Sequence, residues 1–413
     1  PVTIGNRNDV PLRGYKKDPQ KHVMMPAMAR ARHLFVEERT EKLREYAETS
    51  GINKTEYNSD AIGIICAGTT YNYAKEAMGK NASYLKLGMV NPLPVKLIKD
   101  FASKVKRLVV IEELDDIIET HCLKNGIPCE GKNLFPVCGE FSQSIVRKAL
   151  TGEENSYVSV DCELPPRPPV LCAGCPHRAS FYAVKKAMKG KKTIFCGDIG
   201  CYTLGNAMPL DMVDTCLCMG AGLNIAQGVE KVEPDTTCFA FVGDSTFFAS
   251  AITGVVNAVY NQANMVLIVL DNSTTAMTGH QPHPGTGRTV MGEIVQKINI
   301  EQVLHGIGVT DVETVNPLDL HTSVECVQKM AERSGVKAII FKSPCIAVTK
   351  PAAPLHVSSD KCIGCKKCIK ELGCPAIVLN NGNVCIDSSM CTGCGLCSQV
   401  CPVTAITGGE DHE

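Results

Sequence analysis

The chain has 413 residues and a formal net charge of −1. A chain of this length folds into about two to four domains, each large enough to bury a core of its own. The near-zero charge does not favour nucleic acid or an anionic membrane surface as a partner. The sequence has no signal-peptide pattern and no apolar run of about eighteen residues, so we expect a cytoplasmic protein that does not enter a membrane.

The first two segments of the chain differ in character. Residues 1–58 are predicted to be a lead-in segment, basic and irregular at first and then a charged helix. Residues 59–151 are predicted to form a small α/β domain, because the apolar runs 61–66 and 108–111 have the pattern of buried parallel strands. Helical patterns near residues 71–78 and 94–103 separate these runs.

A proline-rich stretch within residues 165–169 is predicted to be a linker to a third segment. From there to residue 350 strand and helix patterns alternate, with glycine-rich turns where strands end. This alternation predicts a doubly wound α/β domain, whose ligand site lies at the carboxyl ends of its strands.

Two polar residues stand where neighbouring strands of this domain should end. An apolar strand, 238–242, runs into Gly243-Asp244-Ser245, and a second strand, 265–270, ends in Asp271-Asn272. The helix expected after Ser245 has an apolar face that includes Ala249, Ile252 and Val256.

Asp244 and Asn272 are 28 positions apart, so one β-α-β unit brings a carboxylate and an amide oxygen to the same edge. Such hard oxygen ligands suit Mg²⁺, which shares its other sites with water and a diphosphate. Gly243 would let the backbone approach the phosphates, and the following helix N-terminus favours their charge. Asp-Ser at a strand end is more often a helix cap, but the Asn at this distance favours the metal site.

Eight of the 23 cysteines form a doubled pattern near the C-terminus, repeated at an offset of 29 residues. In each motif two residues separate each of the first three cysteines from the next, and these three thiolates hold one face of a 4Fe-4S cluster. The fourth cysteine, which precedes a proline, binds the other cluster. The first ligand set is Cys362, Cys365, Cys368 and Cys401; the second is Cys391, Cys394, Cys397 and Cys374. A zinc ribbon or a disulfide framework is the alternative. Residues 351–413 are thus predicted to be an α+β two-cluster ferredoxin domain, whose oxygen-labile clusters suit the cytoplasm of an anaerobe.

The motifs together resemble the 2-oxoacid:ferredoxin oxidoreductases, and most closely the alpha subunit of the indolepyruvate ferredoxin oxidoreductase family. The likeness spans residues 61–406. It rests on the glycine-aspartate and asparagine motif, on the fused double-cluster tail, and on three further stretches, 171–178, 197–201 and 218–222.

This resemblance implies thiamine diphosphate as the cofactor. Mg²⁺ would be held by the side chains of Asp244 and Asn272 and by the Thr274 carbonyl, with Gly243, Ser245 and Gly220 at the cofactor. It also implies that residues 59–151 are similar to the transketolase C-terminal domain and that residues 165–350 bind the pyrophosphate. The family's pyrimidine domain, with its activating glutamate, precedes these domains, and we expect it on a part of the protein outside this sequence or on another chain.

The implied reaction is the oxidative decarboxylation of an aryl 2-oxoacid, such as indolepyruvate or phenylpyruvate, with coenzyme A. Electrons would leave one at a time through the clusters to ferredoxin, and a smaller beta subunit would complete the enzyme. His177 and Arg178 could contact diphosphate or substrate carboxylate, and His280 and Gln281 could face the reacting centre. A packed or solvated histidine is an equally good interpretation of each.

The same family likeness implies a third, proximal cluster beside thiamine. Its expected ligands are Cys172, Cys175, Cys201 and Cys345, which occur in the family's order within one domain. Buried free cysteines are the alternative.

The substrate itself is not visible in the sequence, which has no tryptophan and 5% aromatic residues. A pyruvate or branched-chain oxidoreductase therefore remains open, as does a subunit that relays electrons without catalysis. An intact magnesium motif speaks against a relay, and the cluster tail speaks against a non-oxidative decarboxylase.

Overall fold

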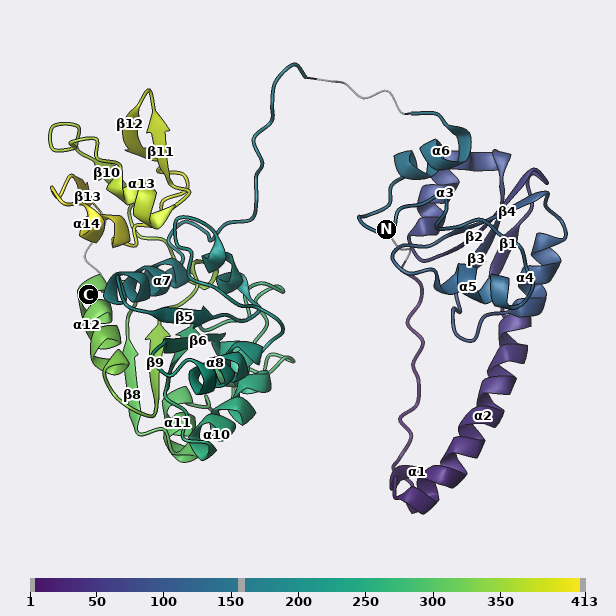
Figure 1. Ribbon diagram of the computed structural model, residues 1–413, viewed down its shortest axis with the longest axis horizontal. Helices are drawn as coiled ribbons and strands as arrows, with labels where there is room; N and C mark the ends of the chain where they lie inside the picture. Colours follow the sequence, from purple (N-terminus) through teal and green to yellow (C-terminus); the bar gives the residue numbers. More distant parts are fainter. Residues whose placement is uncertain (1–3, 155–159, 409–413) are drawn as a thin grey trace. The chain divides into compact units, whose positions relative to one another are not determined.

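The computed structural model describes residues 4–154 and 160–408. The chain divides into two compact units, Pro1–Glu163 and Leu164–Glu413, which we treat separately (Figure 1). None of the helices within the described residues is long and apolar enough to cross a membrane.

The first unit is a four-stranded sheet with helices on both faces. The strand order is β1-β3-β2-β4, in which the last three strands are parallel and β1 is an antiparallel edge. The strands are β1 (Lys54–Glu56), β2 (Ile62–Ala67), β3 (Ser83–Leu87) and β4 (Arg107–Ile111). The helices are α1 (Pro19–His22), α2 (Pro26–Thr49), α3 (Thr70–Met78), α4 (Val95–Ala102), α5 (Ile117–Lys124) and α6 (Gln143–Thr151). Separate apolar clusters fill the two faces of the sheet, because its central strands are apolar on both sides.

The expected boundary at residue 58 needs correction. Strand β1 lies before it and pairs with β3, and Glu48 at the end of α2 accepts hydrogen bonds from the backbone of Lys96 and Leu97 in α4. The end of the predicted lead-in is therefore part of this domain. Strand β1 could not be recognised in the sequence, because it is a largely exposed edge strand of three residues and has no apolar pattern.

The second unit contains a five-stranded, wholly parallel sheet of order β5-β6-β7-β9-β8. Its strands are β5 (Thr193–Cys196), β6 (Thr237–Gly243), β7 (Met265–Asp271), β8 (Asp311–Val315) and β9 (Val336–Lys342). Helices α7 (Pro176–Ala187) and α12 (Leu320–Ala331) pack on one face of this sheet. Helices α8 (Ala221–Val232), α10 (Ile252–Tyr260) and α11 (Ile300–Ile307) pack on the other (Figure 1).

The chain leaves β6 through an unusual helix. One turn of α-helix, α9 (Asp244–Thr246), is followed by a π-helical turn, Phe247–Ala251, and then by α10. A π turn adds a residue and rotates the helix face, so the residues that pack inward are Phe247, Ala251 and Val255. Of the predicted apolar face, Ile252 packs against this core, but Ala249 and Val256 are exposed, so the prediction was wrong for these two residues.

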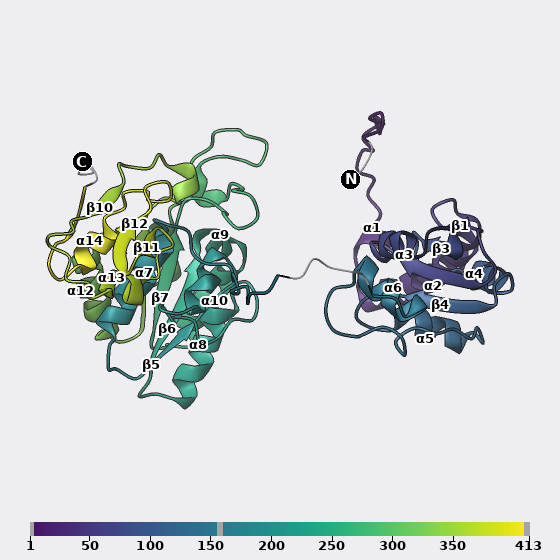
Figure 2. The ribbon, with the colours of Figure 1, turned by 90° about the horizontal axis from the view of Figure 1, so that it is seen from above.

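The C-terminal segment folds against α7 and α12 instead of forming a compact unit of its own (Figure 2). It has two small antiparallel pairs, β10 (Leu355–Val357) with β13 (Ile406–Gly408) and β11 (Ile377–Asn380) with β12 (Asn383–Ile386). Two short helices, α13 (Lys367–Leu372) and α14 (Leu396–Val400), complete it. Its apolar residues join the core cluster of α7 and α12, so the second unit has a continuous core on this side.

Candidate active site and cluster-binding loops

The carboxyl ends of β6 and β7 bring the two predicted magnesium ligands to one edge. The two strands pair in register up to Gly243 and Leu270. Asp244 directly follows β6 and Asn272 directly follows β7, so both residues lie just beyond the sheet. Both side chains are buried, at 2% and 6% exposure. The expectation that one β-α-β unit would bring these two groups to the same edge therefore agrees with the geometry.

Asp244 has an oxygen without a hydrogen-bond partner. Its Oδ1 accepts a hydrogen bond from the backbone of Ser245 at 2.8 Å, but Oδ2 is buried and has no such partner among the described residues. His283 Nε2 lies 3.1 Å from this Oδ2 without forming a hydrogen bond of good geometry. A buried carboxylate oxygen left in this state is costly, and a cation is the ligand that would satisfy it.

The amide of Asn272 is oriented by a neutral histidine. Its Nδ2 lies 3.2 Å from His177 Nε2, and burial lowers the pKa of His177 to about 4, against the opposing effect of the Asp244 charge. The imidazole is therefore neutral near pH 7, and Nε2 can accept the amide hydrogen. Asn272 Oδ1 accepts from the backbone of Thr274 at 3.3 Å, and Thr274 is buried at the same edge.

A second carboxylate adds to the negative charge at this edge. Burial, and next the charge of Asp244, raise the pKa of Asp271, whose nearest cation, Lys342 Nζ, is 3.9 Å away. Among the described residues no three His, Cys, Asp or Glu side chains share one metal position. The predicted site instead needs one carboxylate and neutral oxygens. The orphaned Oδ2 and the oriented amide fit such a magnesium ion.

Tyr202 explains why the motif needs glycine. Its hydroxyl donates to Asp198 Oδ2 at 2.8 Å, and its ring lies so close to the end of β6 that a Cβ on Gly243 would be 2.6 Å from it. The backbone N–H of Gly220, at the start of α8, donates to the other oxygen of Asp198 at 2.8 Å. Gly220 has φ +84°, and a Cβ there would lie 2.7 Å from Ser250 Oγ. Gly243 is thus required by the ring of Tyr202, and Gly220 by its left-handed backbone and by Ser250.

His280 and Gln281 are not brought against Asp244. Both are exposed, and the side chain of Gln281 bonds to the hydroxyl and the carbonyl of Thr278 in its own turn. His283, which sequence reasoning missed, is the buried histidine of this loop. The sequence does not distinguish His283 from His280, because only the conformation of the loop makes one side chain buried and the other exposed. Tyr202 was missed for a related reason, since it lies in a short 3-10 helix, Cys201–Asn206.

The four cysteines proposed for a proximal cluster lie near one another. Burial raises the pKa of Cys201, and negative charge on Cys345 and Cys172 adds to this effect. Burial raises the pKa of Cys175 to about 12, whereas the N–H groups of His177 and Arg178 at the start of α7 lower it. The backbone N–H of Cys345 donates to the carbonyl of Asn272 at 2.9 Å. This loop is therefore joined directly to the predicted magnesium site.

The C-terminal cysteines of each predicted set lie near one another, and their binding of clusters stays a prediction. Those of the first set line a common small cavity together with apolar side chains; they are Cys362, Cys365, Cys368 and Cys401. In the second set, burial raises the pKa of Cys397 to about 12, and the charges of Cys394, Cys374 and Cys391 add to it. In the prediction each set combines three cysteines of one motif with the Cys-Pro ligand of the other.

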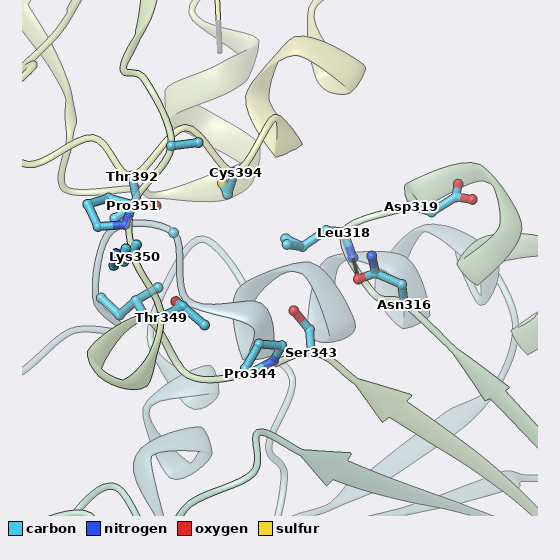
Figure 3. Close-up of a pocket in the computed structure, with 13 residues that line it drawn as sticks. Asn316, Leu318, Asp319, Ser343, Pro344, Thr349, Lys350, Pro351, Thr392 and Cys394 are labelled. Atoms are coloured by element: carbon cyan, nitrogen blue, oxygen red, sulfur yellow. Dashed lines mark hydrogen bonds between the residues drawn. The ribbon is translucent and has the colours of Figure 1, made fainter. Parts of the chain in front are cut away.

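A cavity of about 510 Å³ lies between the sheet domain and the C-terminal segment (Figure 3). Ser343, Pro344 and Asn316 line it from the sheet domain, and Thr392 and Cys394 from the segment. Gly174, between Cys172 and Cys175, has φ +72°, and a Cβ on it would be 1.8 Å from Thr392 Oγ1. The loop of Cys172 and Cys175 therefore contacts the loop of Cys391 and Cys394, and this close approach is possible because residue 174 has no side chain.

Comparison with known proteins agrees with this geometry. Residues 198–341 match the model of the C-terminal TPP-binding domain of thiamine pyrophosphate enzymes, and residues 384–407 match the 4Fe-4S binding domain. The chain thus combines the TPP-binding domain of thiamine pyrophosphate enzymes with a 4Fe-4S binding domain.

Its relatives define the family. The chain is 38% identical to indolepyruvate oxidoreductase subunit IorA of Methanothermobacter thermautotrophicus, over 98% of this chain and 69% of that protein. It is 37% identical to the IorA subunit of Archaeoglobus fulgidus, over 96% and 68%. The chain belongs to the family of IorA subunits of indolepyruvate oxidoreductase. A 2-oxoglutarate:ferredoxin oxidoreductase from Magnetococcus marinus matches at a TM-score of 0.40 and 20% identity, over 45% of this chain and 67% of that one.

Proposed function

We propose that this chain carries the decarboxylating site and the electron exit of an enzyme that oxidises aryl 2-oxoacids with coenzyme A. The substrates are indolepyruvate and phenylpyruvate, the products are the aryl-acetyl-CoA and carbon dioxide, and ferredoxin accepts the electrons. The names of the relatives support the aryl substrate. The observation that carries the proposal is the Cys345–Asn272 hydrogen bond, because it joins a cluster loop to the cofactor edge.

The chain's own residues have separate roles in this proposal. Asp244 supplies the charge for Mg²⁺, and Asn272 supplies a neutral oxygen whose direction is set by His177. Thiamine diphosphate, when bound, supplies the nucleophilic carbon and accepts the electrons left by decarboxylation. His177 stays neutral at physiological pH because it is buried, so it holds Asn272 and does not deliver a proton.

The cysteine loops provide the proposed route for electrons. The proximal set lies beside Asn272, and the two crossed sets follow in the C-terminal segment. A smaller beta subunit and the pyrimidine domain with its glutamate complete the site in this proposal. The test therefore needs the whole enzyme.

An anaerobic assay of the whole enzyme tests the proposal. Indolepyruvate, phenylpyruvate, pyruvate and a branched-chain 2-oxoacid are each supplied with coenzyme A, and reduction of a viologen dye is followed. We expect the highest kcat/KM for the aryl acids and no dye reduction without coenzyme A. A preference for pyruvate or the branched-chain acid would contradict the aryl assignment, and no turnover with any acid would favour a relay subunit.

A further inference from the structure

Arg178 is a buried cation whose hydrogen bonds all go to backbone carbonyls. It lies in the first turn of α7 and is 4% exposed. The suggestion that it contacts a diphosphate or a substrate carboxylate does not hold, because its guanidinium points to the C-terminal segment. Nη1 donates to the carbonyls of Leu372 and Gly373 at 2.6 and 3.0 Å.

The other side of the guanidinium holds the proposed proximal loop. Nη2 donates to the carbonyls of Leu171 and Cys172 at 2.6 and 3.4 Å. One residue therefore joins the loop of Cys172 to the end of α13, directly before Cys374. The planar fork of arginine suits this task, since it presents donors in fixed directions that lysine lacks.

The charge of Arg178 has no carboxylate partner. None of the ion pairs found among the described residues includes it, and its Nε–H is buried without an acceptor. A buried guanidinium is expensive unless an opposite charge compensates it. Thiolates are the nearby candidates, because two of the carbonyls that Arg178 binds belong to Gly373, directly before Cys374, and to Cys172. A cluster with four thiolate ligands is an anion, and reduction makes it more negative.

We propose that Arg178 is the buried counter-charge and positioning clamp of the cluster held by Cys374, Cys391, Cys394 and Cys397. Its carbonyl bonds fix the distance between this cluster's loop and the proximal loop. Its charge stabilises the reduced cluster and so keeps the reduction potential higher than it would otherwise be. The inference rests on the proposed function only in requiring that this cluster is present.

Two variants of the complete enzyme separate charge from packing. Arg178→Gln removes the charge and keeps a donor, whereas Arg178→Lys keeps the charge and loses the fork. Tyr182→Phe is the matched control: it lies one turn along α7 and removes a hydrogen bond to Glu371 across the same interface, and it removes no charge. Iron content and an EPR-monitored redox titration are measured for each.

We expect Arg178→Gln to shift the potential of this cluster to a more negative value and to leave the cluster of Cys362, Cys365, Cys368 and Cys401 unchanged. Arg178→Lys and Tyr182→Phe should titrate close to the unmodified enzyme. Equal potentials in Arg178→Gln and the unmodified enzyme would overturn the proposal. If the Arg178→Gln variant loses iron, the Arg178→Lys variant decides between charge and packing. Retention of iron by Arg178→Lys supports the role of the charge, and equal loss of iron in both variants refutes the proposal. An unmodified enzyme without this cluster would instead refute the proposed cofactor content.

Discussion

The magnesium site shows how much can depend on a single unpaired oxygen. Asp244 Oδ2 is buried next to a second carboxylate and to His283, yet it has no hydrogen bond among the described residues. A folded protein tolerates such a group where a ligand completes it. The structure thus supplies an argument for the cation that the sequence motif alone could not, because spacing says nothing about unsatisfied atoms.

Asp244→Asn should abolish this charge without changing the side-chain volume. We expect the affinity for thiamine diphosphate and Mg²⁺ to fall roughly 10–100-fold or more, with unchanged iron content. Asp319→Asn is a matched control after β8, at the same sheet edge, because asparagine still caps α12 through Thr322. Titration calorimetry of the anaerobic enzyme measures both. Normal cofactor binding by the Asp244→Asn variant would show that the magnesium site is elsewhere.

Cys201→Ala tests the proximal cluster. If Cys201 holds iron together with Cys172, Cys175 and Cys345, the variant should lose about four irons per chain, or retain a cluster with three irons. Cys326→Ala, a buried cysteine of α12 outside every proposed set, should lose none. Iron analysis and EPR of the complete enzyme give the answer. The same iron content in both variants would leave the C-terminal clusters as the whole relay.

At the scale of elements, apolar runs were sufficient to find the central strands. Strands β2, β4, β6 and β7 were predicted within one residue at each end, because strands buried on both faces are continuously apolar. The edge strand β1 and the π turn after α9 were not, since the first has no apolar pattern and the second breaks the helical period. Tyr202 and His283 reach the site through loop geometry that no short pattern encodes.

The crossed ligand sets give a test for the C-terminal elements. Cys401→Ala should remove the cluster of Cys362, Cys365 and Cys368 and spare its neighbour, because Cys401 lines their cavity although it follows the second motif. Cys385→Ala, in β12 and outside both motifs, is the control. EPR of the reduced enzyme distinguishes the two clusters. Loss of the other cluster would reverse the assignment of the fourth ligands.

At the scale of the whole molecule, the cluster segment and the doubly wound sheet belong to one compact unit. Leu355, Leu372 and Leu396 of the segment belong to the same apolar cluster as Phe181 and Val327 of α7 and α12. Polar contacts reinforce it: Gln399 accepts from the backbone of Leu320 at 2.9 Å and donates to the carbonyl of Leu318 at 2.7 Å. A relay of electrons benefits from such fixed docking, since the distance between clusters then does not fluctuate.

Cleavage of the segment that connects the sheet domain to the cluster segment tests this shared core. Lys350 and Pro351 are exposed, so a recognition sequence for a site-specific protease inserted between them should be accessible. After anaerobic cleavage we expect residues 351–413 to co-elute with the remainder in gel filtration and to keep their iron. The apolar side chains buried between the two parts still hold them together after the peptide bond is cut. Uncut protein with the same insertion is the control. Separate elution of the cut segment would mean that the covalent link, and not the core, holds the clusters in place.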